Sequence, residues 1–402
     1  MKATRLFLAT SILVGIIFLN GCEKSGVNLG GQAVRFNASA QTGPSTKTEY
    51  SGEGTIANGF LTWERINWLP EDHIRVASNY AYLQDPGDGG LSMGIHYADY
   101  ALGDIQIKAG DPTRSVAVMK PYIVTPPYFT GSNGLVWDDK HADGYIFYAV
   151  YPCPFENSNI SLGSGDDGTT LGEVTATIPA GQVASGTKTR YTSASGAVAD
   201  ASGNIYSTVP EGGLTYTVYQ PDMSYAFMSA AVSDVAANTD GVTLVFNPAY
   251  TAFEFHITTE DAEPLTISKI SLTATGSDDY LAGEYSFTSG SDFNMGTPEV
   301  SITTSGAQKT VSMALSDASI NQTEGIAATL FAIPKTNAGA LKLTLVTSEG
   351  TASLPFVDAS KNPVPFDGGK KYRINLLKVR DTWKFFASVE DMSYSGYNII
   401  NF

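Results

Sequence analysis

The sequence is poor in the residue types on which many functional sites depend. Its 402 residues include only two cysteines and four histidines. Lysine and arginine number 24 against 40 aspartates and glutamates, which gives a formal charge of −16. Nucleic-acid binding needs clustered basic residues that neutralise phosphates, so this balance argues against a nucleic-acid partner. The histidines share no spacing with one another or with a cysteine, so we expect no metal site.

Recognisable catalytic motifs are missing as well. The chain has no nucleophile elbow, phosphate loop or dinucleotide fingerprint, so no catalytic residue and no cofactor is predicted. Acidic turns such as 137–143 and 278–279 lack the alternating oxygen ligands of an EF-type calcium loop and are interpreted as solvated turns. The two catalytic carboxylates of a glycosidase are brought together by the fold and have no fixed spacing in the sequence, so a pair of this type stays an open alternative. These absences favour a protein that is not an enzyme.

The first 21 residues have the layout of a cleavable secretion signal. Two basic residues precede the apolar run Leu6–Leu19, which is too short to span a bilayer. The run leads into Gly21 and Cys22, a pair that resembles the end of the lipobox of bacterial lipoproteins. We therefore predict a signal peptide over residues 1–21 and lipidation of Cys22. The alternative is an ordinary secretory signal.

The rest of the sequence favours strands and turns. Charged residues form only 16% of the chain, and apolar runs of strand length recur between Gly, Pro, Asn and Asp. No later stretch has a convincing helical period; the nearest, Met228–Ala237, could form one or two helical turns at a domain junction. Once Cys22 is acylated, Cys153 has no disulfide partner, so packing alone must hold the core. The predicted fold class is all-β, built from antiparallel sandwiches.

The length of the mature chain indicates two domains. About 380 residues remain after the signal, more than the usual ~100–200 per domain. A change of composition near Glu211–Gly213, followed by Tyr219–Asp222, marks the predicted end of the first domain. The predicted domains are residues 22–222 and 223–402.

Six segments together resemble the fimbrillin family, the type V pilins that some Gram-negative bacteria export as lipoproteins. The resemblance implies two transthyretin-like antiparallel β-sandwich domains in tandem and the role of a pilus subunit in the shaft, at the tip or at the anchor. It also implies an outer membrane lipoprotein precursor at the cell surface, trimming by a trypsin-like protease, and polymerisation with other pilin subunits by strand exchange. The segments are Ile66–Val76, Tyr148–Pro152, Val174–Gln182, Pro221–Ala226, Val242–Ile257 and Phe366–Leu376.

Strand exchange requires a first strand that can be removed, and residues 32–47 are the candidate. Val34, Phe36 and Ala38 alternate as the apolar face of one half-buried strand should. The linker that follows carries Lys47 among Gly, Ser, Thr and Pro residues, a composition open to proteolysis. We therefore predict cleavage after Lys47, with an uncleaved linker as the alternative.

The tail over residues 383–402 is the candidate for the incoming strand. Apolar residues alternate along it, and an apolar face of this kind has to be buried against something. The tail of another subunit could fill the slot left by the first strand by β-augmentation, with Phe385 and Val389 among its anchors. The alternative is an edge strand folded back on its own second domain.

A monomeric surface lipoprotein that binds glycans for a polysaccharide uptake system is the alternative function. Trp63, Trp68 and Trp137 could form a platform on which sugar rings stack, whereas the alternative for these tryptophans is core packing. A host or glycan ligand for a fimbrial subunit is left open as well.

Replacing Cys22 by serine tests the lipid anchor. The Cys22→Ser precursor should leave the membrane fraction and lose palmitate labelling, because the acylated thiol is gone. Fractionation and labelling of cells that express each form provide the measurement. A variant that stays in the membrane and still labels would contradict the prediction.

Overall fold

The computed structural model describes most of the chain beyond the predicted signal. Residues Gly31–Phe402 form one compact unit. Cys22 and Lys47 lie outside the described residues. Within the described part, no helix is long and apolar enough to cross a membrane. The described residues are 32–40, 49–50, 55–57, 60–62, 66–68, 72–83, 94–107, 115–122, 134–163, 171–192, 196–199, 205–209, 214–290, 299–334, 340–356, 369–391 and 397–400.

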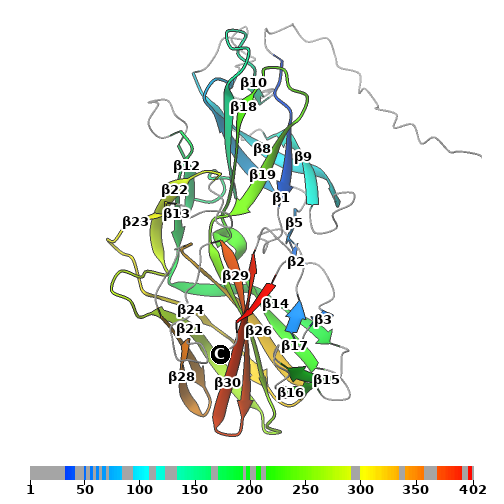
Figure 1. Cartoon of the computed structure of the whole chain (residues 1–402), viewed down its shortest axis with the longest axis vertical. Coiled ribbons are helices and arrows are strands. Elements are labelled where there is room, and N and C mark those ends of the chain that lie inside the picture. The colour runs from blue at the N-terminus through cyan, green and yellow to red at the C-terminus, as the bar shows by residue number, and fades with distance from the viewer. Residues whose placement is uncertain are drawn as a thin grey trace, which may run out of the picture. The chain divides into compact units, whose positions relative to one another are not determined.

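Seven strands close into a barrel whose order is β1-β19-β18-β11-β6-β8-β9 (Figure 1). Alternating apolar side chains point inward and form one core, as the period of two in these strands requires. The strands are β1 (Phe36–Ala40), β6 (His73–Ser78), β8 (Tyr97–Ile107), β9 (Ser115–Pro121), β11 (Tyr145–Tyr151), β18 (Met228–Val235) and β19 (Val242–Pro248).

The largest sheet runs β28-β27-β21-β24-β14-β17-β26-β20-β29-β30-β31, with β25 paired to β21. Its strands are β14 (Gly181–Thr192), β17 (Leu214–Pro221), β20 (Thr251–Thr259), β21 (Leu265–Ala274), β24 (Thr310–Ala314), β25 (Ser319–Ile320), β26 (Glu324–Ala332), β27 (Leu341–Thr347), β28 (Gly350–Phe356), β29 (Lys370–Val379), β30 (Thr382–Asp391) and β31 (Tyr397–Ile400).

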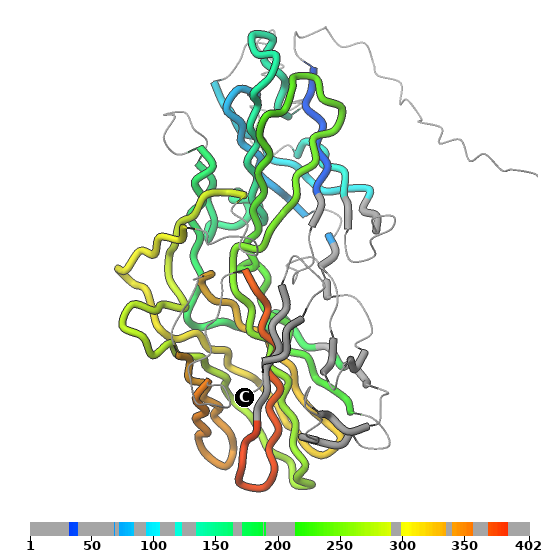
Figure 2. Tube along the Cα trace, in the orientation of Figure 1, coloured from blue at the N-terminus to red at the C-terminus, as the bar shows by residue number. Residues whose placement is uncertain are grey.

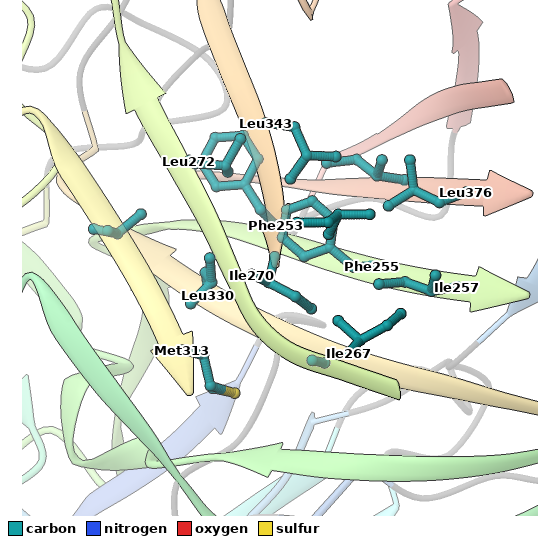
Figure 3. Close-up of a cluster of buried hydrophobic side chains, with 14 of the residues drawn as sticks. Phe253, Phe255, Ile257, Ile267, Ile270, Leu272, Met313, Leu330, Leu343 and Leu376 are labelled. Atoms are coloured by element: carbon teal, nitrogen blue, oxygen red, sulfur yellow. The ribbon is translucent and has the colours of Figure 1, made fainter. Parts of the chain in front are cut away.

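Strand β14 is the corner of this sheet. Gly181–Val183 pair with β24, and from Ala184 onward the strand pairs with β17, with a register shift between Ala184 and Gly186. The two halves of the sheet enclose one apolar core, in which Ile270 and Leu343 of one half lie with Phe253 and Leu376 of the other (Figure 3).

The remaining strands form smaller sheets. Four make the sheet β12-β13-β22-β23, and the others pair two by two as β7 with β10, β15 with β16, β2 with β5 and β3 with β4. Their bounds are β2 (Glu49–Tyr50), β3 (Thr55–Ala57), β4 (Phe60–Thr62), β5 (Ile66–Asn67), β7 (Tyr82–Leu83), β10 (Leu135–Val136), β12 (Ile160–Leu162), β13 (Glu173–Ile178), β15 (Gly196–Ala199), β16 (Ile205–Val209), β22 (Gly283–Thr288) and β23 (Ser301–Ile302).

The predicted all-β class is confirmed. The single helical element of the described residues is a 3₁₀ turn at Met223–Tyr225. Residues 228–235, in the stretch that could have formed one or two helical turns, form strand β18 between β11 and β19. Met228 and Ala230 alternate into the barrel core, so burial overrides the helical preference of the alanines there. The transthyretin-like detail stays a prediction.

Strands from both sides of residue 222 share the sheets. β18 and β19 follow that residue and belong to the barrel, whereas β14 and β17 precede it and belong to the large sheet. The small sheet likewise pairs β13 with β22. The division at residue 222 stays a prediction, and the chain crosses between sheets around it.

The residues that follow β22 connect the small sheet to the barrel. The Ser289 hydroxyl donates to the carbonyl oxygens of Ala149, 3.0 Å away, and Ala230, 2.8 Å away. Gly290 follows with φ of +78°, and a Cβ built there would lie 2.9 Å from the Ala231 backbone nitrogen. This close approach requires glycine.

Alanine at Gly290 should therefore destabilise the protein more than alanine at Gly306. Both glycines have positive φ, but a Cβ at Gly306 would meet nothing within 4 Å. The difference in the free energy of unfolding between the two variants therefore measures the steric clash at Gly290, which we expect to cost about 1–3 kcal/mol. Urea denaturation of Gly290→Ala and Gly306→Ala measures it, and equal midpoints would contradict the contact.

Candidate assembly site

Strand β1 is the piece that closes the barrel. It pairs in parallel with β19, where Phe36 lies opposite Val242, and in antiparallel with β9, where Phe36 lies opposite Met119. Figure 2 shows this blue segment beside the green trace of β19. Upstream of β1, the Val34 N–H donates to the carbonyl oxygen of Leu135 in β10 at 2.9 Å. One short strand therefore joins β9 to β19 through the pairs of residues 36–40.

The predicted alternation of β1 is confirmed by burial. Val34, Phe36 and Ala38 are buried in the barrel core. Arg35 points outward with 77% of its side chain exposed, 3.8 Å from the exposed carboxylate of Asp240. An exposed pair at that distance contributes little to stability, so β1 is held by its backbone hydrogen bonds and its apolar face.

Phe36 is the largest anchor of β1. Its ring meets the ring of Tyr100 edge-on at 5.2 Å and that of Phe147 at 5.1 Å between centroids. The Tyr100 hydroxyl accepts a hydrogen bond from the Leu135 N–H at 2.8 Å, and burial raises the pKa of that hydroxyl well above its ordinary value. The aromatic site around Phe36 is thus rigid and fully enclosed.

The tail predicted for strand exchange is paired in the large sheet. Strand β30 runs antiparallel to β29, with Phe385 opposite Leu376 and Val389 opposite Tyr372. Strand β31 covers the outer edge of β30. Trp383 is partly buried and packs against the core of the large sheet. The two segments predicted to exchange therefore lie in different sheets of this chain.

The tryptophan platform expected of a glycan-binding protein is not formed by Trp68 or Trp137. Both are buried in the barrel core. The Trp68 ring meets the ring of Tyr151 at 5.1 Å, and the Trp137 ring meets that of Tyr145 at 4.7 Å. Neither tryptophan has a face to offer a sugar ring, so the interpretation of core packing is confirmed for both; Trp63 lies outside the described residues.

A buried cluster of charges ties β20 to β29, and sequence reasoning missed it. The Glu254 carboxylate lies 2.7 Å from the His256 ring nitrogen and 3.5 Å from Nε of Arg373, and it pairs with the Lys371 ammonium. Burial alone would raise the pKa of Glu254, but Lys371 and Arg373 lower it well below its ordinary range. The signal that could have found the cluster is the alternation of Glu254 and His256 with apolar residues.

The one cysteine within the described residues is not a nucleophile. Cys153 is buried, and burial together with the nearby Asp99 carboxylate raises its pKa to about 12. The thiol therefore stays protonated at neutral pH. Asp99 itself binds Arg75 through two hydrogen bonds of 2.7 and 2.8 Å. No group of three potential metal ligands occurs among the residues that the structure describes.

Comparisons with known proteins were made at three levels. No protein-family model matches the chain, and no curated protein matches it. Among solved structures, a Bacteroides uniformis protein assigned to cell adhesion is similar, with 15% identity and a TM-score of 0.46 over 89% of this chain and 98% of that one.

Two further similar structures carry fimbrial names. A fimbrial assembly protein of Parabacteroides distasonis has 12% identity and a TM-score of 0.36 over 92% of this chain and 99% of that one. A C-terminally truncated tip fimbrial protein of Porphyromonas gingivalis has 10% identity and a TM-score of 0.36 over the same shares.

Truncating Phe36 should show how strongly β1 is held. We expect Phe36→Ala to lower the free energy of unfolding by about 3–5 kcal/mol, because it empties an enclosed aromatic site. Arg35→Ala is the matched control on the same strand and should change it by less than about 0.5 kcal/mol. Urea denaturation of the full chain provides both values. Similar midpoints for the two variants would show that β1 is not part of the core in solution.

Proposed function

We propose that this protein is a structural subunit of a bacterial surface fimbria. It is exported as a lipoprotein precursor anchored in the outer membrane, trimmed by a protease, and polymerised with other pilin subunits by strand exchange. The observation that carries the proposal is the position of β1, which alone joins β9 to β19. The first described strand of the chain is thus the one whose loss opens the barrel.

Removal of β1 would create a site for another strand. A closed barrel has no free edges, whereas the opened barrel would expose unpaired backbone groups on both β9 and β19. It would also expose the apolar sites that the Val34 and Phe36 side chains fill, and burial of each side chain stabilises by about 1.5–3 kcal/mol. An extended segment of another subunit that restores the backbone hydrogen bonds and the apolar burial would bind tightly.

The pairing of β1 supports cleavage after Lys47 in preference to Arg35. The Arg35 carbonyl oxygen accepts a hydrogen bond from the Val242 N–H at 2.8 Å, so the backbone at Arg35 is held within the barrel. A trypsin-like protease needs an extended, accessible segment. Lys47 follows β1 in the sequence, so a cut there releases β1 and the lipid together.

Amino-terminal sequencing of assembled material tests the cleavage. We expect polymers to begin at Thr48, directly after Lys47, and Lys47→Gln to reduce trimming and polymerisation together. Arg35→Gln is the matched control and should leave both unchanged. Polymers that begin at Cys22 would contradict the processing step.

Deleting the tail tests the donor segment. The form lacking Trp383–Phe402 should be a soluble, trimmed monomer that no longer polymerises, since the segment that fills the slot is gone. Phe385→Asp or Val389→Asp should give an intermediate defect, because a charge in an apolar site is costly. Circular dichroism checks folding, and electron microscopy checks for fibres. An unfolded truncated protein would assign the tail to its own core, and fibres from it would place the donor elsewhere.

A further inference from the structure

Two groups of four strands carry a row of hydroxyl side chains on their outer face. Each row consists of directly opposed residues on four neighbouring strands, and the residues before and after each hydroxyl belong to an apolar core. Side chains alternate between the two faces of a sheet, so both rows point away from the cores. In the large sheet the row on β28, β27, β21 and β24 is Ser353, Thr344, Ser271 and Ser312. In the small sheet the row on β12, β13, β22 and β23 is Ser161, Thr175, Ser286 and Ser301.

Two lysines flank the row of the large sheet, and we call this surface the lysine face. Lys342 lies two residues before Thr344 on β27, and Lys269 lies two residues before Ser271 on β21. Since β27 and β21 are antiparallel, the lysines lie on opposite sides of the row. Both are exposed, and neither forms an ion pair with a residue that the structure describes. The outward residues of these four strands are all described, and none of them is acidic.

Two glutamates flank the row of the small sheet in the same way, and we call this surface the glutamate face. Glu173 lies two residues before Thr175 on β13, and Glu284 lies two residues before Ser286 on the antiparallel strand β22. Both glutamates are exposed, and neither has an ion-pair partner in the described part of the chain. Glu284 accepts one hydrogen bond, from the Thr303 hydroxyl at 3.0 Å. No outward residue of these four strands, which the structure describes throughout, is basic.

The two pairs of charges have the same spacing. On each face the charged residues lie on neighbouring antiparallel strands, two residues to either side of the row. With strands about 4.8 Å apart and about 3.4 Å per residue, the two Cα atoms of each pair are separated by roughly 14 Å. Two positive charges can therefore meet two negative charges at once when the faces are laid together.

We propose that the lysine face of one copy of this chain docks on the glutamate face of a second copy, with the two lysines paired to the two glutamates. Both faces are exposed, so they do not meet within one copy. The contact is heterologous, because each copy contributes a different surface, and it can therefore continue from copy to copy. It uses no residue of β1 or of the tail, so it is a contact separate from strand exchange.

The side chains of both faces allow close approach. Apart from the lysines and glutamates, every outward residue of these eight strands is Ser, Thr, Ala, Val or Pro. Hydroxyl groups both donate and accept hydrogen bonds, so the two rows can bond to each other directly or through water. The absence of an outward aromatic residue on these described strands removes the ring on which a sugar would stack. The charges and the shape thus favour a second copy over a glycan as the occupant.

A single contact of this size is weak. Four strands by about five residues cover roughly 300 Å² on each copy, well below the ~800 Å² per partner of a standard complex. Exposed ion pairs add little strength and are screened by salt. Where copies are also joined in a fibre, as the proposed function holds, many such contacts act together and draw neighbouring fibres side by side.

Carbodiimide cross-linking identifies the residues in contact, because it joins only amines and carboxylates that touch. The Cys22→Ser chain, untrimmed and without lipid, is prepared with light and with heavy isotopes, mixed at high concentration in low salt and cross-linked. We expect peptides that join Lys269 or Lys342 of one isotope form to Glu173 or Glu284 of the other. Salt of about 1 M should remove them, since the Debye length falls to ~3 Å. Links from these lysines to other carboxylates, or no link between copies, would overturn the inference.

Charge reversal tests the pairing without chemistry. Lys269→Glu with Lys342→Glu should weaken association of the same chain roughly tenfold, measured by sedimentation equilibrium in low salt, because attraction becomes repulsion. Glu173→Lys with Glu284→Lys should weaken it as much, although this pair makes the acidic chain less acidic and would strengthen association if net charge were decisive. All four reversals together should restore it, because the signs are again opposite.

Two reversals outside the faces serve as the control. Lys140→Glu with Glu263→Lys changes two exposed residues and should associate like the unmodified chain. Every variant is first checked for a native circular dichroism spectrum. A loss with the lysine reversals alone would assign the lysine face to a different acidic partner and overturn the second copy as its occupant.

The inference and the proposed function fail separately. An unmodified chain that stays monomeric at high concentration would overturn the docking of the two faces and leave strand exchange untouched, because strand exchange begins only after trimming. Trimmed chains that dock through these faces but form no fibres would instead overturn the proposed function.

Discussion

The pairing of one short strand with two neighbours at once is the constraint on which this structure depends. Strand β1 supplies hydrogen bonds to β9 on one side and β19 on the other, and these belong to distant parts of the sequence. Without that strand the barrel has two unpaired edges and an open core. The aromatic site of Phe36 adds side-chain specificity to this backbone requirement, since Tyr100 and Phe147 are held by the same core.

Strand β30 is the last but one in the large sheet and pairs with β29 on one side and β31 on the other. The buried cluster of Glu254, Lys371 and Arg373 joins β29 to β20. Release of β30 would therefore leave β29 paired with β20, as the proposed exchange requires.

Local pattern was sufficient to predict the strands but not their pairing. The alternation of Val34, Phe36 and Ala38 matches their burial, and the segment Tyr148–Pro152 overlaps strand β11. The stretch 228–237 was ambiguous because the preference of alanine for helix is weak against barrel burial. The tryptophans left core packing and a sugar platform open because residue type does not show which face is covered. The parallel pairing of β1 with β19 was out of reach, since partners about 200 residues apart leave no local signal in the sequence.

The most direct test of the account is a helical reconstruction of assembled fibres at side-chain resolution. The account predicts that the strand between β9 and β19 of each subunit belongs to another subunit and fills the site between Tyr100 and Phe147. Fibres in which each subunit keeps its own β1, with Phe36 in that site and β30 still paired to β29, would contradict it.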